Sequence, residues 1–206
     1  ARVNLPDPER PGEGMPENAG GAPRLSTLAQ KLGVGDPDTI MVAAGDLIGA
    51  SPRLSSLFHD EPTIEWLSRM GLALAAVGNH EFDEGADELR RIQNGGFHPT
   101  DGCMGPTPYK GAGFRYLAAG AVDTKTGETV FPGHALREFG GVKVGFIGLT
   151  LSTTASLIAP FAREGVEFRD EVETINAETA KLKQAGVEAI VVLIHEGGYP
   201  AREGDP

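Results

Sequence analysis

The sequence predicts an α/β fold with a mainly parallel sheet that carries helices against its faces. Short apolar runs of strand length alternate along the chain with longer amphipathic runs of helix length. Strand–helix–strand order of this kind is typical of parallel sheets. The 206 residues, 40% of them hydrophobic, suffice for one large domain with a proper core. The sequence has no internal repeat and no credible boundary between domains.

Glycine and proline mark the ends of the expected elements in the first part of the chain. Leucines recur at helical spacing up to Leu32, and Gly33 and Gly35 then end that helix. Pro52 and Pro62 each favour the first turn of a helix. The expected elements are an extended loop over 1–21, a helix over 22–32, a strand over 39–44, a helical turn from 52, a helix over 62–71 and a strand over 72–77.

The second part contains a long Gly- and Pro-rich excursion over 95–113, a length typical of a functional loop or an insertion. Thr126 and Gly127 predict a turn between two antiparallel strands, and Gly186 is expected to end a helix. The expected elements are a charged helix over 84–93, antiparallel strands over 114–122 and 130–139, a strand over 142–149, a helix over 171–186 and a strand over 188–194.

Three of the predicted strands end directly at polar side chains. Asp46 follows the first of them, Asn79 and His80 follow the second, and His195 follows the third. Because loops at the carboxyl ends of strands bind ligands in open α/β sheets, we expect these side chains to meet at one edge of one sheet. Gly78 would let the backbone turn sharply ahead of Asn79. The alternative is that these are ordinary polar loops.

The donor atoms at these strand ends suit a metal ion. Carboxylate oxygen, amide oxygen and imidazole nitrogen are ligands for divalent transition metals. No thiolate is offered there, which excludes an iron–sulfur cluster or a cysteine-held zinc at these loops. The one cysteine, Cys103, is interpreted as an incidental thiol. His59, His98 and His134 are interpreted as surface or packing histidines.

Charge and motif content exclude several classes of function. A formal net charge of −11 argues against nucleic acid as the natural partner, although metal ions could still hold a small phosphate compound. No apolar run is long enough for a membrane span, and the sequence contains no signal peptide. A phosphate-binding P-loop, a dinucleotide fingerprint, a nucleophile elbow and a His-Glu-x-x-His zinc helix are all absent.

Three motifs together resemble those of a known family. They are GDLIGASP at 45–52, GNHEFD at 78–83 and HEGG at 195–198. They look like the calcineurin-like metallophosphoesterases, and more narrowly like the N-terminal catalytic domain of bacterial bifunctional 5′-nucleotidases and 2′,3′-cyclic nucleotide phosphodiesterases. The likeness runs in order over most of the chain and includes 143–150. It implies a four-layer α/β/β/α sandwich that holds two divalent metal ions, either Zn, Mn, Mg or Ca.

The resemblance also implies a role for each matching residue. Asp46 would bridge the two metals, and Asn79 and His195 would complete much of the second metal site. His80 would contact the phosphoryl oxygens or the leaving oxygen, while Asp83 would orient its imidazole and keep it protonated. A metal-activated water would attack phosphorus. The implied substrates are nucleotides, with UDP-sugars and other phosphate esters left open.

Two ligand motifs of that family have no counterpart in this sequence. No aspartate has a histidine two places later, and the one Gly-His pair, at Gly133 and His134, is in the wrong place for the late Gly-His-x-His motif. We therefore expect residues 1–206 to be a single catalytic domain that is incomplete at both ends and inactive by itself. The resemblance places the C-terminal nucleotide-binding domain outside this chain, and it implies a secreted, periplasmic or cell-wall protein. The alternative is a catalytically silent binding or structural domain on the same fold.

Overall fold

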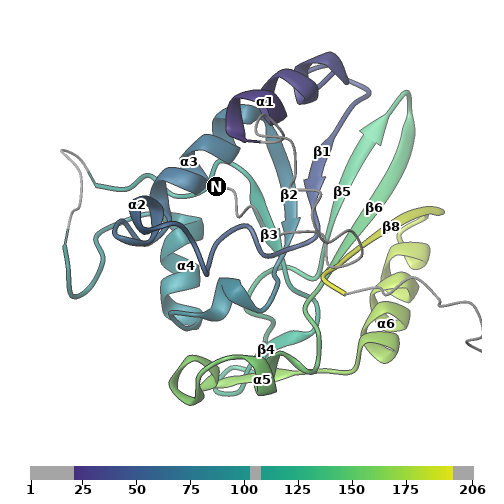
Figure 1. Ribbon diagram of the computed structural model, residues 1–206. Coiled ribbons are helices and arrows are strands. Elements are labelled where there is room, and N and C mark those ends of the chain that lie inside the picture. Colours follow the sequence, from purple (N-terminus) through teal and green to yellow (C-terminus); the bar gives the residue numbers. More distant parts are fainter. Residues whose placement is uncertain (1–20, 103–107, 197–206) are drawn as a thin grey trace, which may run out of the picture.

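The computed structural model of the protein describes residues 21–102 and 108–196 (Figure 1). Most of the loop expected over 1–21, the cysteine Cys103 and the end of the HEGG motif lie outside the described residues. In chain order the elements are α1 (Ala22–Lys31), β1 (Met41–Ala43), α2 (Arg53–Ser56), α3 (Glu61–Met70), β2 (Leu72–Ala76), the 3-10 turn η1 (His80–Phe82), α4 (Ala86–Asn94), β3 (Arg115–Leu117), β4 (Ala121–Asp123), β5 (His134–Phe139), β6 (Val142–Leu149), α5 (Thr154–Leu157), the 3-10 turn η2 (Pro160–Arg163), β7 (Val166–Phe168), α6 (Glu171–Gln184) and β8 (Ala189–Ile194).

The first sheet has three parallel strands in the order β1, β2, β3. Helix α3 packs on β2 with Ile64, Leu67 and Met70, which recur at helical spacing and are all buried. Burial of each such side chain contributes roughly 1.5–3 kcal/mol. Gly71 ends the helix in the left-handed conformation, with φ of 94°, so the chain turns directly into β2.

The second sheet combines antiparallel and parallel pairing. β5 runs antiparallel to β6, and β8 runs parallel to β6 on its other side. Gly140 and Gly141 connect β5 to β6 with φ of 54° and 84°, and two consecutive left-handed residues are what a two-residue hairpin turn requires. Helix α6 packs on β6. Its first turn is stabilised by Asp170, whose Oδ1 accepts a hydrogen bond from the backbone N–H of Glu173 at 2.9 Å.

The two sheets pack face to face. β2 and β3 contact β6, and β2 also contacts β8. Since α3 covers one sheet and α6 covers the other, the elements lie in the order helices, sheet, sheet, helix (Figure 1). The apolar side chains buried between the sheets are Leu74, Ala76, Leu117, Ala135, Phe146 and Leu193.

Along the described ranges, no helix has both the length and the apolar character needed to cross a membrane.

The mixed α/β class agrees with the sequence prediction, but one expectation about pairing is wrong. β8 belongs to the second sheet, so the three polar strand ends do not share one sheet. The antiparallel turn expected at Thr126 and Gly127 is present, since Val122 forms an antiparallel bridge with Thr129 and the backbone N–H of Val130 donates to the carbonyl of Ala121 at 2.8 Å. Beyond that short stretch the strands join other partners, β3 with β2, β4 with β7 and β5 with β6.

Gly148 on β6 lies directly against Leu117 of β3, and it provides a test of this packing. A Cβ atom at Gly148 would lie 2.3 Å from Leu117 Cβ and 2.6 Å from its carbonyl oxygen. We expect Gly148→Ala to lower the free energy of unfolding by about 1–3 kcal/mol, because those atoms are fixed to the backbone. At Gly145, in the same strand, a Cβ would meet only the side chain of Leu182. Urea unfolding should therefore show a smaller loss for Gly145→Ala, and equal losses would contradict the close approach.

Candidate metal centre

Asp46 and His195 come together from the two different sheets. Asp46 follows β1, His195 follows β8, and the Nε2 atom of His195 lies 2.8 Å from Oδ2 of Asp46. The contact is accessible, since 32% of the histidine side chain and 24% of the aspartate side chain are exposed. A carboxylate and an imidazole therefore meet at a point that a solvated ligand can reach.

The loop after β2 completes this arrangement. The backbone N–H of His80 donates a hydrogen bond to Oδ1 of Asp46 at 3.1 Å. A Cβ atom at Gly78 would lie 2.2 Å from the same Oδ1 atom, so any larger residue would push the two loops apart. Gly78 therefore allows the close approach of the two loops. Asn79 lies between Gly78 and His80 in the chain.

Glu81 connects the loops through a buried carboxylate that is only 3% exposed. Its Oε2 atom accepts hydrogen bonds from the backbone N–H groups of Asp46 at 2.9 Å and Gly78 at 2.6 Å. Its Oε1 atom accepts one from Leu47 at 2.6 Å. Burial raises the pKa of Glu81 to about 7, against the opposing effect of these three donors. Asp46 sits in the left-handed region with φ of 51°, and the bonds from Glu81 fix that conformation.

His80 and Asp83 form a pair on the solvent side of the same loop. The 3-10 turn η1 brings the imidazole Nδ1 to 2.8 Å from Oδ2 of Asp83. Their side chains are 37% and 41% exposed. The hydrogen bond to Asp83 raises the pKa of His80, while partial burial opposes this shift. The pair can therefore hold a proton next to the Asp46 carboxylate.

Contacts connect four of the five residues predicted from the sequence to form the site. Asp46 contacts His195 and accepts the backbone N–H of His80, and Asp83 pairs with the imidazole of His80. Asn79, the fifth, directly precedes His80 in the loop after β2. The donor chemistry of Asp46, Asn79 and His195 fits a divalent cation, because it offers oxygen and nitrogen ligands from three separate loops. Glu81 is the residue to which the sequence analysis gives no role. The sequence feature that could have identified Glu81 is a carboxylate directly next to Phe82, a core residue.

Comparison with known proteins identifies the relatives of this chain. No model of a known protein family matches it. It is 42% identical over 158 residues to the protein named endonuclease YhcR from Bacillus subtilis, which is 77% of this chain and 13% of that protein. It is 38% identical over 176 residues to the cell wall protein Lmo0130 of Listeria monocytogenes, 82% of this chain and 22% of that one. A 5′-nucleotidase of Vibrio vulnificus is 30% identical over 161 residues, 78% of this chain and 26% of the relative.

Solved structures agree with these relatives. A 5′-nucleotidase precursor of Thermus thermophilus matches with a TM-score of 0.68 and 26% identity, over 85% of this chain and 31% of that one. The calcineurin-like phosphoesterase YfkN of Bacillus subtilis matches with a TM-score of 0.68 and 26% identity, over 91% and 57%. The chain is homologous to 5′-nucleotidases and calcineurin-like phosphoesterases. It spans less than two thirds of each of these relatives, so they carry further sequence beyond the matched part.

A second group of metal-type ligands lies elsewhere in this phosphoesterase homologue. The side chains of His59, Glu84, Glu88 and His98 each offer one donor atom, and these atoms all lie within 4.8 Å of one another. This His/Glu cluster could hold a metal ion. Hydrogen bonds to Glu84 and Asp101 raise the pKa of His59, although its burial is the largest single influence and acts in the opposite direction. From the sequence, both histidines are predicted to be surface or packing residues, because His98 lies away from the polar strand ends and His59 lies beside Asp60 at a helix end.

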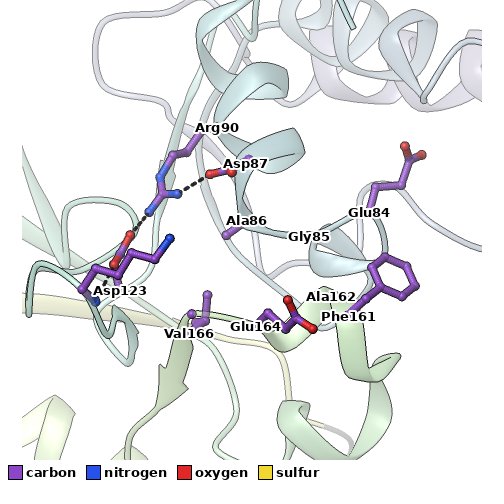
Figure 2. Close-up of a pocket in the computed structure, with 12 residues that line it drawn as sticks. Glu84, Gly85, Ala86, Asp87, Arg90, Asp123, Phe161, Ala162, Glu164 and Val166 are labelled. Carbon is purple, nitrogen blue, oxygen red and sulfur yellow. Dashed lines mark hydrogen bonds and ion pairs between the residues drawn. The ribbon is translucent and has the colours of Figure 1, made fainter. Parts of the chain in front are cut away.

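An open cavity of about 420 Å³ lies between α4, the loop after β4 and η2 (Figure 2). Neither Asp46 nor His195 lines it. Figure 2 shows Arg90 between two carboxylates, and its guanidinium donates to Asp87 at 2.8 Å and to Asp123 at 2.7 Å. Because its charge is already neutralised by these partners, this cavity offers a poorer site for phosphate than the loops around Asp46.

The role of Glu81 can be tested by replacing its carboxylate with an amide. Gln has the same shape, but its NH₂ group would face a backbone N–H that needs an acceptor. We expect Glu81→Gln to lower the free energy of unfolding by about 1–3 kcal/mol, the cost of one unsatisfied buried donor. Glu65→Gln makes the same chemical change at an exposed helix position and should cost less than about 0.5 kcal/mol. If denaturant titrations show the same loss of unfolding free energy for both variants, Glu81 does not hold the two loops together.

Proposed function

We propose that this chain is part of a metal-dependent phosphoric ester hydrolase that acts on nucleotides, of the 5′-nucleotidase or cyclic nucleotide phosphodiesterase type. The observation that carries the proposal is the 2.8 Å contact between Asp46 and His195, made by the ends of two different sheets beside the His80–Asp83 pair. The homology to 5′-nucleotidases supports it. The proposal includes the four-layer α/β/β/α sandwich, of which residues 1–206 form an incomplete domain.

Three residues would hold the metal ions in this proposal. Asp46 would bridge two divalent cations (Zn, Mn, Mg or Ca), and Asn79 and His195 would complete much of one of the two sites. When bound, such ions supply positive charge to a phosphoryl group and lower the pKa of water. The remaining ligands would come from sequence outside this chain, since the family's two other ligand motifs are absent here.

His80 and Asp83 would act on the phosphate ester itself. With Nδ1 of His80 donating to Asp83, a protonated imidazole keeps its Nε2–H free for a phosphoryl or leaving oxygen. The raised pKa of His80 increases the fraction that carries this proton near neutral pH. The exposure of both side chains allows a substrate to reach them.

Small nucleotides fit this site better than nucleic acid does. The net charge of −11 opposes the approach of a polyanion, while a mononucleotide needs only local positive charge. YhcR is named an endonuclease, but this chain matches only 13% of it. The proposal further places the nucleotide-binding domain in other parts of the same full-length protein. It places that protein outside the cytoplasm, as the cell wall relative Lmo0130 suggests.

The division of roles between metal ligands and His80 leads to a prediction for the full-length protein. His80→Asn should reduce the rate of nucleotide hydrolysis by roughly 10²–10⁴, the usual effect of removing a positioned acid or base, and should leave the bound metal unchanged. Asp83→Asn should reduce the rate less, because it alters only the orientation and charge of the imidazole. His134→Asn is the matched control, because His134 lies on β5 of the second sheet and not in the loops around Asp46. Loss of metal in His80→Asn would show that His80 is a ligand.

Metal removal separates the enzyme from a catalytically silent domain. Full-length protein treated with a chelator should lose hydrolysis of AMP and of 2′,3′-cyclic AMP, and added Mn²⁺ should restore both. Plasmid DNA should remain uncut under the same conditions. In the Asp46→Asn variant, added Mn²⁺ should not restore hydrolysis to the wild-type rate. Metal-independent hydrolysis, or cleavage of DNA in preference to nucleotides, would overturn the proposed function.

A further inference from the structure

The His/Glu cluster of His59, Glu84, Glu88 and His98 is assembled from three segments of the chain. His59 lies in the turn between α2 and α3, Glu84 precedes α4, Glu88 lies in the first turn of α4, and His98 lies in the loop after α4. His59 and the residue after it are both left-handed, with φ of 49° and 59°. A turn with two strained non-glycine residues directs the imidazole of His59 toward α4. The two imidazoles stack with ring centroids 3.7 Å apart.

The distances between donor atoms match those around a small divalent ion. Nδ1 of His59 lies 2.8 Å from Oε2 of Glu84. Nε2 of His98 lies 3.9 Å from Oε2 of Glu84 and 3.9 Å from Oε2 of Glu88. Four ligands at zinc-ligand distances in a tetrahedron lie about 3.3 Å from one another. These three separations bracket that value and all pairs of donor atoms lie within 4.8 Å, so the side chains would move closer together to complete the coordination.

Asp101 orients His59 as a carboxylate commonly does behind a metal-bound imidazole. Its Oδ2 atom lies 3.0 Å from Nε2 of His59, which leaves Nδ1 of that ring to face Glu84. The same Oδ2 atom lies 3.8 Å from Nδ1 of His98. In the structure that nitrogen accepts the backbone N–H of Asp101 at 3.1 Å. Ligation through Nε2 would therefore move the His98 proton to Nδ1, where the Asp101 carboxylate is the nearby acceptor.

The charge and burial of the cluster also favour a cation. The side chains of His59, Glu88 and His98 are only 10–13% exposed, whereas Glu84 is 48% exposed and leaves a route from solvent. Arg91 donates to both carboxylate oxygens of Glu88, at 2.7 and 2.6 Å, and also to Glu61 at 2.7 Å, so its single positive charge is shared between two carboxylates. Two neutral imidazoles and two carboxylates would balance the charge of one divalent ion.

We propose that His59, Glu84, Glu88 and His98 bind one divalent transition-metal ion of the zinc type, separate from the centre at Asp46 and His195. The ion would join the loop after α4 to the turn before α3. Glu84 directly follows Asp83, and a small cavity of about 30 Å³ is lined by residues of both regions, including His59, Glu84, His80 and Asp83. The metal would therefore also stabilise the segment that carries the His80–Asp83 pair.

Zinc binding in a background that lacks the other centre tests this site. In full-length protein carrying Asp46→Asn and His195→Asn, equilibrium dialysis and elemental analysis should find one more bound zinc per chain than in the same protein with His98→Ala added. Adding Glu84→Gln, a conservative change at a half-exposed side chain, should also remove that zinc. Adding His134→Ala, a histidine outside the cluster, should leave it bound. Asp101→Asn should weaken its binding by about 10- to 100-fold.

Cobalt(II) gives a second measurement that needs no substitution within the cluster itself. In the Asp46→Asn, His195→Asn background, added Co²⁺ should produce the visible absorption of a four-coordinate site with nitrogen and oxygen ligands. The same zinc content with and without His98→Ala, together with no such absorption in the background protein, would overturn the proposal. The cluster would then be an ion-paired network of His59 with Glu84 and Asp101. Neither result depends on the nucleotide hydrolysis proposed above.

Discussion

The carboxylate of Glu81 is the interaction on which the rest of the site depends. It accepts three backbone hydrogen bonds, two from the loop after β1 and one from the loop after β2. These bonds hold Asp46 in a left-handed conformation that a non-glycine residue adopts only at an energetic cost. Removing the acceptor would leave buried N–H groups unpaired, so the two loops can separate only at a cost of several hydrogen bonds.

The position of the site follows from the packing of one sheet on the other. β8 is not in the same sheet as β1 and β2, but it contacts β2 across the interface, and its end therefore reaches Asp46. Two glycines allow this close packing, one between the sheets and one between the loops. Gly148 allows the sheets to approach at Leu117, and Gly78 allows the loops to approach at Asp46. Asp46 and His195 therefore meet because the two sheets pack together, although the strands that precede them belong to different sheets.

Much of this could be predicted from the sequence, and the remainder has a physical reason. Apolar runs ending at Asp46, Asn79 and His195 predicted strand ends with metal-type ligands, because the period and the polarity change are local properties. The partition into two sheets was not predictable from those runs, since the runs of β1 and β8 are equally apolar and differ only in their partners. Glu81 and the His59–His98 pair were missed for a related reason. Their importance lies in contacts between distant segments, and no spacing in the sequence records such contacts.

The structure of the full-length protein crystallised with zinc would test the central claim most directly. Anomalous scattering at the zinc absorption edge locates the ion without any assumption about its ligands. The account predicts a peak between Asp46 and His195, at about 2.0–2.2 Å from Oδ2 of the first and Nε2 of the second. The hydrogen bonds of Glu81 should be preserved in that structure. A direct Asp46–His195 contact that persists at saturating zinc, with no peak beside it, would contradict the claim that these loops form a metal centre.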